Sequence, residues 1–238
     1  MKKIIVFITA SFFAANINAQ NEIVVDPNAS VRNATGQFDA IKISGGIDLF
    51  LSQSDNVAIA VSAGSEDFKE GIKTVIEDGT LKIFYKGEVS WSKKNRKLRA
   101  YVSFKDLKKL EASGACDVIV SGTLNVSTLA IHMSGASDFT GKIKADVLKL
   151  NLSGASDAKI SGTAGTAVIE SSGASDVKGY DLVTDICKAD VSGASDVYIT
   201  VNAELSAKAT GASDISYKGT ALIKDMHTSG ASSIARKN

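Results

Sequence analysis

The pentapeptide Ser-Gly-Ala-x-Asp recurs along the second half of the chain and constrains the fold more than any other feature. Copies begin at Ser113, Ser134, Ser153, Ser172 and Ser192, and variant copies begin at Thr210 and Ser229. The glycines of successive copies are 18 to 21 residues apart. A fixed period of about twenty residues is the sequence signature of a solenoid built from one repeat per turn. A degenerate copy at Ser44–Asp48 places the start of the array well before the clean repeats.

Alignment of the copies on their glycine gives columns of like residues. The position four residues before the glycine is apolar in every copy: Leu110, Ile131, Leu150, Ile169, Ala189, Ala207 and Met226. A second apolar column follows the motif Asp, from Val118 to Ile234, and the position after the first column is polar throughout. Such period-two alternation is typical of strands with one buried face. Each repeat therefore carries at least two strands, joined by the Ser-Gly-Ala bend.

A single repeat cannot bury its apolar face, so successive repeats must stack. We predict an all-β fold, a right-handed parallel β-helix with rungs of about 19 residues, the hand following the usual sense of parallel crossovers. The alanine of each bend, such as Ala155, should occupy a corner too cramped for a larger side chain. A β-sandwich of hairpins is the alternative, but it favours Asn-Gly or Asp-Gly turns, and only Asp78-Gly79 is present.

The chain divides into three parts. Residues 1–19 read as a signal peptide, with Lys2-Lys3 before a short apolar run and Ala19 before the expected cleavage point. Residues 20–37 form an N-terminal leader or cap, and residues 38–238 form one β-helix domain, with irregular rungs at 38–106 and regular rungs at 107–238. Only 66–77 has helical character. The remaining sequence has no transmembrane segment, so we expect export to the periplasm, the cell surface or the medium.

Three stretches resemble a known family: the repeated Ser-Gly-Ala-Ser-Asp, the opening Phe-Asp-x-Ile-x-Ile-Ser-Gly-Gly at residues 38–46, and Gly-Thr-Leu-Lys-Ile at residues 79–83. They are similar to the head GIN domain family of auto-transporter adhesins, exported proteins common in Bacteroidota. The resemblance covers nearly all of the chain after the signal peptide. It implies a right-handed parallel β-helix and a cell-envelope or secreted location, and it supplies no catalytic residues.

The motif carboxylates should stack in one column: Asp117, Asp138, Asp157, Asp176, Asp196 and Asp214. Neighbours about 4.8 Å apart repel by roughly 0.9 kcal/mol in water. A cation-binding ladder or a glycosidase-like carboxylate pair is one interpretation, but a catalytic pair needs two different environments and a periodic column repeats a single one. We favour a structural role without metal or cofactor, each Asp accepting a backbone N–H at its corner.

The two cysteines, Cys116 and Cys187, are expected to remain free thiols. They lie three to four rungs apart, on the order of 15 Å, whereas a disulfide requires Cα atoms within about 7 Å. Cys116 replaces the motif serine at a bend, so we expect it to be the more accessible of the two.

A basic loop at 86–99 is the main irregularity in the sequence. Its candidate ligand-binding residues are Trp91, Lys93, Lys94, Arg96 and Lys97. Cations around an exposed indole could hold glycans or envelope polyanions, although a solvated charged loop is the alternative. The whole chain, with 27 basic and 26 acidic residues, does not read as a nucleic-acid binder.

Taken as a whole, the sequence predicts an exported, non-enzymatic binding or scaffolding module at the cell envelope. A β-helical carbohydrate-active enzyme and a purely structural envelope protein are the alternatives, and the oligomeric state is left open. Catalysis needs groups with different environments around one reacting atom, and this chain spreads its polar residues in periodic columns.

Overall fold

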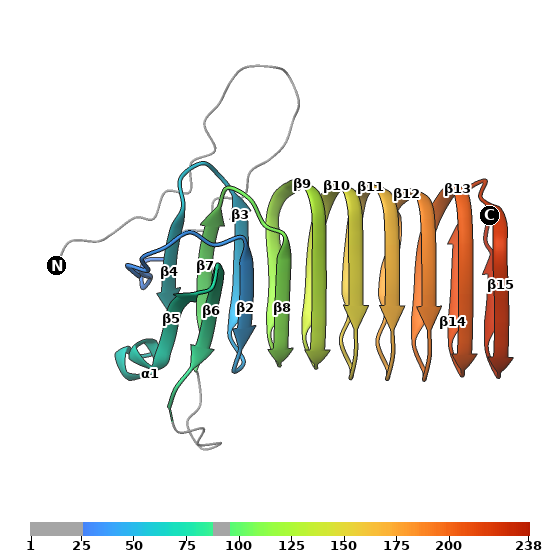
Figure 1. Cartoon of the computed structure of the whole chain (residues 1–238). Helices are drawn as coiled ribbons and strands as arrows, with labels where there is room; N and C mark the ends of the chain where they lie inside the picture. The colour runs from blue at the N-terminus through green and yellow to red at the C-terminus, as the bar shows by residue number, and fades with distance from the viewer. Residues whose placement is uncertain (1–25, 88–95) are drawn as a thin grey trace.

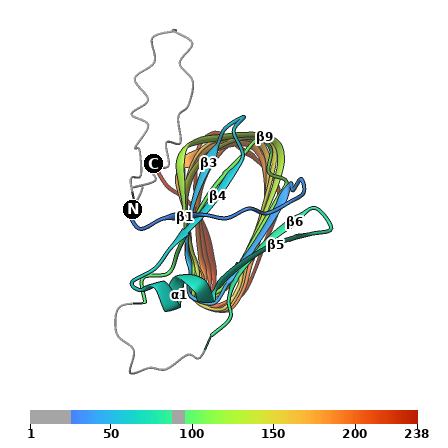
Figure 2. The same cartoon turned by 90° about the vertical axis from the view of Figure 1, so that its left-hand side faces the viewer.

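The computed structural model describes residues 26–87 and 96–238, so the predicted signal peptide at 1–19 lies outside the described residues. Within them, sixteen strands join into one continuous hydrogen-bonded sheet. The sheet winds into a long solenoid, with the helix α1 near the N-terminal end and the last strands at the opposite end (Figure 1). Seen along its length, the solenoid is a flattened oval (Figure 2).

The regular part of the solenoid is built from nine strands in parallel pairs. They are β8 (Lys109–Gly114), β9 (Asp117–Gly135), β10 (Asp138–Leu152), β11 (Ala158–Ser171), β12 (Val177–Val191), β13 (Asp196–Gly211), β14 (Asp214–Lys218), β15 (Leu222–Gly230) and β16 (Ser233–Arg236). Long strands run along both sides of the oval: the beginning of β9 pairs with β3, and its end pairs with β8.

Residues that share a predicted column are paired with each other in the observed strand registers. Leu150 pairs with Ile131 on one side and with Ile169 on the other, and Phe139 pairs with Val118 and Ala158. These residues are buried in a core that runs the length of the molecule between the two sides of the oval. The β-solenoid with rungs of about 19 residues is therefore confirmed, and its right-handed sense stays a prediction.

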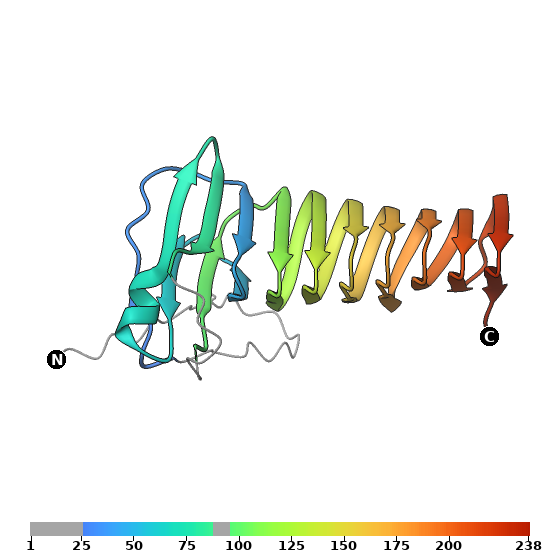
Figure 3. The ribbon, with the colours of Figure 1, turned by 90° about the horizontal axis from the view of Figure 1, so that it is seen from below.

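The N-terminal part adds β1 (Ser30–Val31), β2 (Ala40–Ser44), β3 (Asp48–Gln53), β4 (Ala58–Ser62), α1 (Glu66–Gly71), β5 (Ile72–Glu77), β6 (Thr80–Tyr85) and β7 (Arg99–Phe104). Strands β2 and β3 pair directly with β8 and β9, although residues 54–108 separate them in sequence. Strands β6 and β7 pair with the other edges of β2 and β3. The intervening segment thus lies outside the first rung, where antiparallel β1, β4 and β5 cover the end of the stack (Figure 3).

The segment with predicted helical character, 66–77, is divided between two elements. Ser65 caps α1, its Oγ accepting a hydrogen bond from the Phe68 N–H at 3.4 Å. The helix ends at Gly71, and the β-branched residues that follow form β5, as their preference for extended backbone favours. No helix in the described ranges is long and apolar enough to cross a membrane.

The bend of each rung depends on its glycine. Gly154 has a φ of +79°, and a Cβ there would lie 2.5 Å from the carbonyl oxygen of Gly135 in the preceding rung. The corner prediction for alanine is wrong, because Ala155 is exposed and the next residue, Ser156, is completely buried. The bend directs the serine inward, where its Oγ accepts the N–H of Ser137 at 3.3 Å.

Both cysteines are free, as predicted. The expected accessibility of Cys116 is wrong: its exposure is 0%, against 1% for Cys187. Cys116 occupies the buried serine position of its bend and donates to the carbonyl oxygen of Ser113 at 3.3 Å. Burial raises the pKa of Cys187 to about 12, so this thiol is neutral at physiological pH.

Candidate functional site

The regular side formed by β3, β14, β16 and the first halves of β9 to β13 is interrupted by a bulge in β12. Gly179 pairs with Ile199, but the next pair joins Val183 to Thr200, so residues 180–182 have no partner in β13. Bulges redirect side chains and are frequent next to binding sites. The bulge is held in place because Thr200 Oγ1 donates a hydrogen bond to the Tyr180 carbonyl oxygen at 2.7 Å.

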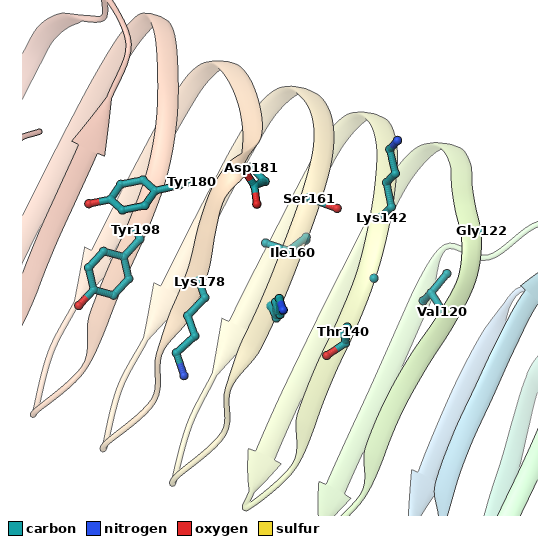
Figure 4. Close-up of a pocket in the computed structure, with 12 residues that line it drawn as sticks. Val120, Gly122, Thr140, Lys142, Ile160, Ser161, Lys178, Tyr180, Asp181 and Tyr198 are labelled. Atoms are coloured by element: carbon teal, nitrogen blue, oxygen red, sulfur yellow. The ribbon is translucent and has the colours of Figure 1, made fainter. Parts of the chain in front are cut away.

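A groove of about 680 Å³ lies beside the bulge. Its polar lining includes Thr140, Lys142, Lys159, Ser161, Lys178, Tyr180, Asp181 and Tyr198, and its apolar lining includes Val120 and Ile160. Figure 4 shows Lys142, Lys178 and Tyr198 on different rungs, so the groove extends along the solenoid rather than within one turn. We refer to this feature as the tyrosine–lysine groove. A concave, partly apolar surface with a few convergent polar groups is the usual form of a binding site.

Two tyrosines form one end of the groove. The rings of Tyr180 and Tyr198 meet edge to face, with centroids 5.3 Å apart and planes at 64°. The Lys218 ammonium lies 4.9 Å from the centre of the Tyr180 ring, within cation–π range. Burial and the neighbouring Asp196 carboxylate raise the pKa of Tyr198. Its hydroxyl, which donates to Asp196 at 3.2 Å, therefore stays protonated at neutral pH.

Lysines supply the charge of the groove. Lys178 is paired, its ammonium lying 2.7 Å from Asp157 and 3.8 Å from Asp176, and the hydrogen bond to Asp157 raises the pKa of Lys178. Lys142 and Lys159 are exposed and make no ion pair with any residue that the structure describes. The lining holds three lysines and one carboxylate, Asp181. The neighbouring Asp column balances part of this positive charge, as Asp157 and Asp176 do for Lys178.

The Asp column runs beside this groove, and its carboxylates link neighbouring rungs. Asp138 Oδ1 accepts the N–H of Asp157 at 3.2 Å, and Asp157 Oδ1 accepts the N–H of Asp176 at 3.3 Å. The pattern continues from Asp176 to Asp196 and from Asp214 to Ser233. The donor is thus the next rung's amide rather than one at the same corner. In the described part of the chain, no three His, Cys, Asp or Glu side chains are grouped to hold a metal ion.

The basic loop is described only in part, because Trp91, Lys93 and Lys94 lie outside the described residues. The Arg96 guanidinium lies 4.6 Å from the centre of the Tyr85 ring, and the Arg96 carbonyl oxygen accepts the Gly64 N–H at 2.9 Å. Lys97 is exposed. Arg96 therefore contacts the body of the protein, and ligand binding by the loop stays a prediction.

Sequence reasoning missed the tyrosine–lysine groove, although two signals pointed to it. Lys159, Lys178 and Tyr198 all stand two residues after a motif Asp, and parallel pairing aligns them on the outer surface. The interval from Gly173 to Gly193 is 20 residues, one more than the two intervals before it. That extra residue is the bulge that carries Tyr180.

Comparisons with known proteins agree with this architecture. The family model described as "Putative auto-transporter adhesin, head GIN domain" matches residues 37–221. A search of curated proteins found no match.

Several solved structures share the fold. A putative adhesin from Bacteroides fragilis is 22% identical, with a TM-score of 0.77 over 88% of this chain and 97% of that one. A putative lipid binding protein from Parabacteroides distasonis is 22% identical, with a TM-score of 0.67 over 89% and 97%. A putative adhesin from Parabacteroides merdae is 19% identical, with a TM-score of 0.60 over 89% and 97%. At these identities the likeness shows the fold alone.

Proposed function

The chain belongs to the head GIN domain family of auto-transporter adhesins, and from that premise we propose that it is an exported, non-enzymatic module that binds acidic glycans at the cell envelope. The observation that carries the proposal is the tyrosine–lysine groove, in which a column of aligned polar side chains meets the bulge that carries Tyr180. The solved structures that share the fold include two described as putative adhesins, which supports binding as the task of this fold.

The chemistry of the groove favours a sugar acid. Lys142 and Lys159 present ammonium groups without a carboxylate partner in the described chain, and they attract carboxylate or sulfate groups. The Tyr180 and Tyr198 rings offer apolar surface together with a hydroxyl donor, a combination suited to a ring that is polar at its edge. Because these side chains come from successive rungs, an extended polymer lying along the solenoid could contact several of them at once.

Catalysis on such a polymer is not expected. Hydrolysis or elimination needs an acid and a base with separately tuned environments. The groove lining offers Asp181 as its single carboxylate, and the nearby column carboxylates Asp138, Asp157 and Asp176 are engaged with backbone amides. We therefore propose binding without turnover.

The test is calorimetric titration of the exported protein with polygalacturonate, with neutral dextran as the control polymer. We expect weak binding to polygalacturonate that falls with rising salt, because exposed charges are screened, and no binding to dextran. Lys142→Gln with Lys159→Gln should weaken binding at least tenfold. The matched control is Lys149→Gln with Lys188→Gln. These two lysines are exposed, share a column with each other and lie outside the groove, so the control removes the same charge elsewhere.

A Lys93→Ser, Lys94→Ser, Lys97→Ser variant separates the groove from the basic loop, and it leaves Arg96 in place because Arg96 packs on Tyr85. Loss of binding in the loop variant alone would move the site to the loop. Equal loss in the groove pair and its matched control would reduce the interaction to general charge, and release of unsaturated or reducing ends would overturn the non-enzymatic assignment. Binding to anionic vesicles but not to polygalacturonate would favour a lipid ligand instead.

A further inference from the structure

The last rung of the solenoid, formed by β15 and β16, has an open edge. Strand β15 pairs with β13 and β16 pairs with β14, and no other described strand pairs with either of them, apart from their contact with each other through the bend. Leu222, Ile223 and Met226 are 62%, 36% and 43% exposed. In the rung before, Leu205 and Ala207 pair with Ile223 and Met226 and are buried. The end of the core is thus uncovered here, whereas β1, β4 and β5 lie at the other end (Figure 2).

The backbone of this rung fixes which residues can bond to a further strand. The amides of Ser233 and Lys237 donate to the Ser213 and Tyr217 carbonyls at 3.1 and 2.8 Å. Since successive residues of a strand direct their N–H and C=O groups to opposite edges, those of Ile234 point to the open edge.

The same argument applies to β15. The Ser229 N–H itself donates to Ser232 Oγ within the bend at 3.2 Å, so the direction is taken from the column of Asp225. In that column the Ala130 amide donates to the Lys108 carbonyl of the preceding rung at 2.9 Å. Because β15 pairs with β13 without a register shift from residue 225 onward, alternation from Asp225 places the N–H and C=O of Met226 on the open edge. Met226 and Ile234 therefore both present free backbone groups.

We propose that the occupant of this edge is a second copy of the chain, joined tail to tail by antiparallel pairing of β15 with β15 and of β16 with β16. Met226 and Ile234 lie four residues before and after Gly230, hence at about the same height on the two sides of the rung. One two-fold axis perpendicular to both sides can pass through both residues. Each then becomes a self-pair that exchanges two hydrogen bonds with its equivalent, as an isologous interface requires.

The side chains suit this register. With Met226 on the axis, Asp225 lies opposite the partner's His227, and the pair occurs twice. An imidazole N–H can donate a hydrogen bond to the carboxylate that faces it across the pair. Leu222, Ile223 and Met226, together with their copies, would cover the exposed end of the core. Hydrogen-bond complementarity, free backbone groups and apolar surface all select the same partner and the same register.

Sedimentation of the purified exported protein over a concentration series tests the proposal, and we expect a reversible dimer. Asp225→Lys should weaken the dimer at least tenfold, because it replaces the acceptor for the partner's His227 N–H by a donor. Adding His227→Glu to that variant should restore dimerisation by creating an opposite-charge pair.

Cross-linking tests the register directly. Met226→Cys should form a disulfide-linked dimer on mild oxidation, since hydrogen-bonded residues in antiparallel strands have Cα atoms about 5.5 Å apart, within reach of a disulfide. The matched control is Ile186→Cys, because Ile186 has the same 43% exposure, and the native thiols are buried. A monomer at all concentrations, equal cross-linking in both variants, or failure of His227→Glu to rescue Asp225→Lys would each overturn the proposal.

Discussion

At the scale of single residues, the buried serine of each bend joins the rungs through hydrogen bonds that an apolar side chain could not make. Ser137, Ser156, Ser175, Ser195 and Ser213 are all completely buried. The Oγ of Ser156 accepts the Ser137 N–H, and the Ser156 N–H donates to Ser175 Oγ at 3.2 Å. A buried N–H without a partner is costly, so removing one of these hydroxyls should destabilise the stack.

Ser156→Ala should therefore lower the free energy of unfolding by about 1–3 kcal/mol, because it leaves the Ser137 N–H without its acceptor in a dry environment. Urea unfolding monitored by circular dichroism measures the change. The control is Ala155→Ser at the exposed neighbouring position, which should stay within about 0.5 kcal/mol of the parent. A comparable loss of stability in both variants would contradict the hydrogen-bond argument.

The columns of large apolar residues could be predicted from sequence, but the direction of the small residues in the bend could not. Burying a leucine or isoleucine is favourable at any inward position, so the residue types of Leu150 and Ile169 already indicate that these side chains face the core. Ala155 and Ser156 differ little in size, and a serine is buried only where the backbone supplies partners, which is a property of the three-dimensional bend. Cys116 in the serine column was a hint, since cysteine is among the most often buried residues.

At the scale of the structural elements, the stacking of rungs depends on close approach at the motif glycines. Gly154 and Gly46 have similar φ angles, +79° and +69°. A Cβ at Gly154 would lie 2.5 Å from the Gly135 carbonyl oxygen, whereas a Cβ at Gly46 would have its nearest neighbour, the Ala115 carbonyl oxygen, at 3.7 Å. The two positions therefore separate backbone strain from steric overlap between rungs.

Gly46→Ala should cost about 1–2 kcal/mol of unfolding free energy, the strain of a left-handed backbone at alanine. Gly154→Ala should cost distinctly more, because the rungs must also move apart. Thermal and urea unfolding of the two variants measure the difference. Equal losses of unfolding free energy would mean that the glycines are needed only for their left-handed backbone conformation. The close contact between rungs would then not contribute to stability.

The order of the regular rungs could be predicted from the sequence, but the order of the N-terminal strands could not. The motif copies from residue 113 onward stack in chain order because each differs little from the next. Residues 54–106 lack the motif, and nothing in them indicates that β6 and β7 lie outside β2 and β3. That arrangement depends on which long-range pairings bury most surface. The bulge at Tyr180 lengthens one interval between motif glycines, but which residues lose their partner is known only once both strands are paired.

At the scale of the whole molecule, the proposed dimer determines how the grooves of its two copies are placed. The tyrosine–lysine groove lies on the side of the solenoid that contains β14 and β16. The proposed two-fold axis runs perpendicular to the two sides, so it pairs like strands and leaves each side facing the same direction in both copies. A tail-to-tail dimer would thus present two grooves on one side, along one continuous solenoid.

Two grooves on one side predict a dependence of affinity on polymer length. Once one groove is occupied, the second contact of a long chain is intramolecular, and such linkage can raise affinity by about 10²–10⁴. Long polygalacturonate should therefore bind the parent protein at least tenfold more tightly, per groove, than it binds Asp225→Lys. A trigalacturonate, too short to reach both grooves, should bind the two proteins alike.

The comparison is made by calorimetry at equal groove concentration, with sedimentation confirming the state of each protein. The lysine that Asp225→Lys introduces attracts a polyanion. Weaker binding of the long polymer by this variant would therefore not be caused by the change in charge. The Asp225→Lys, His227→Glu variant should recover the length dependence together with the dimer. A dimer that shows no length dependence would place the two grooves on opposite sides, and would require the like-strand pairing to be replaced by pairing of β15 with the partner's β16.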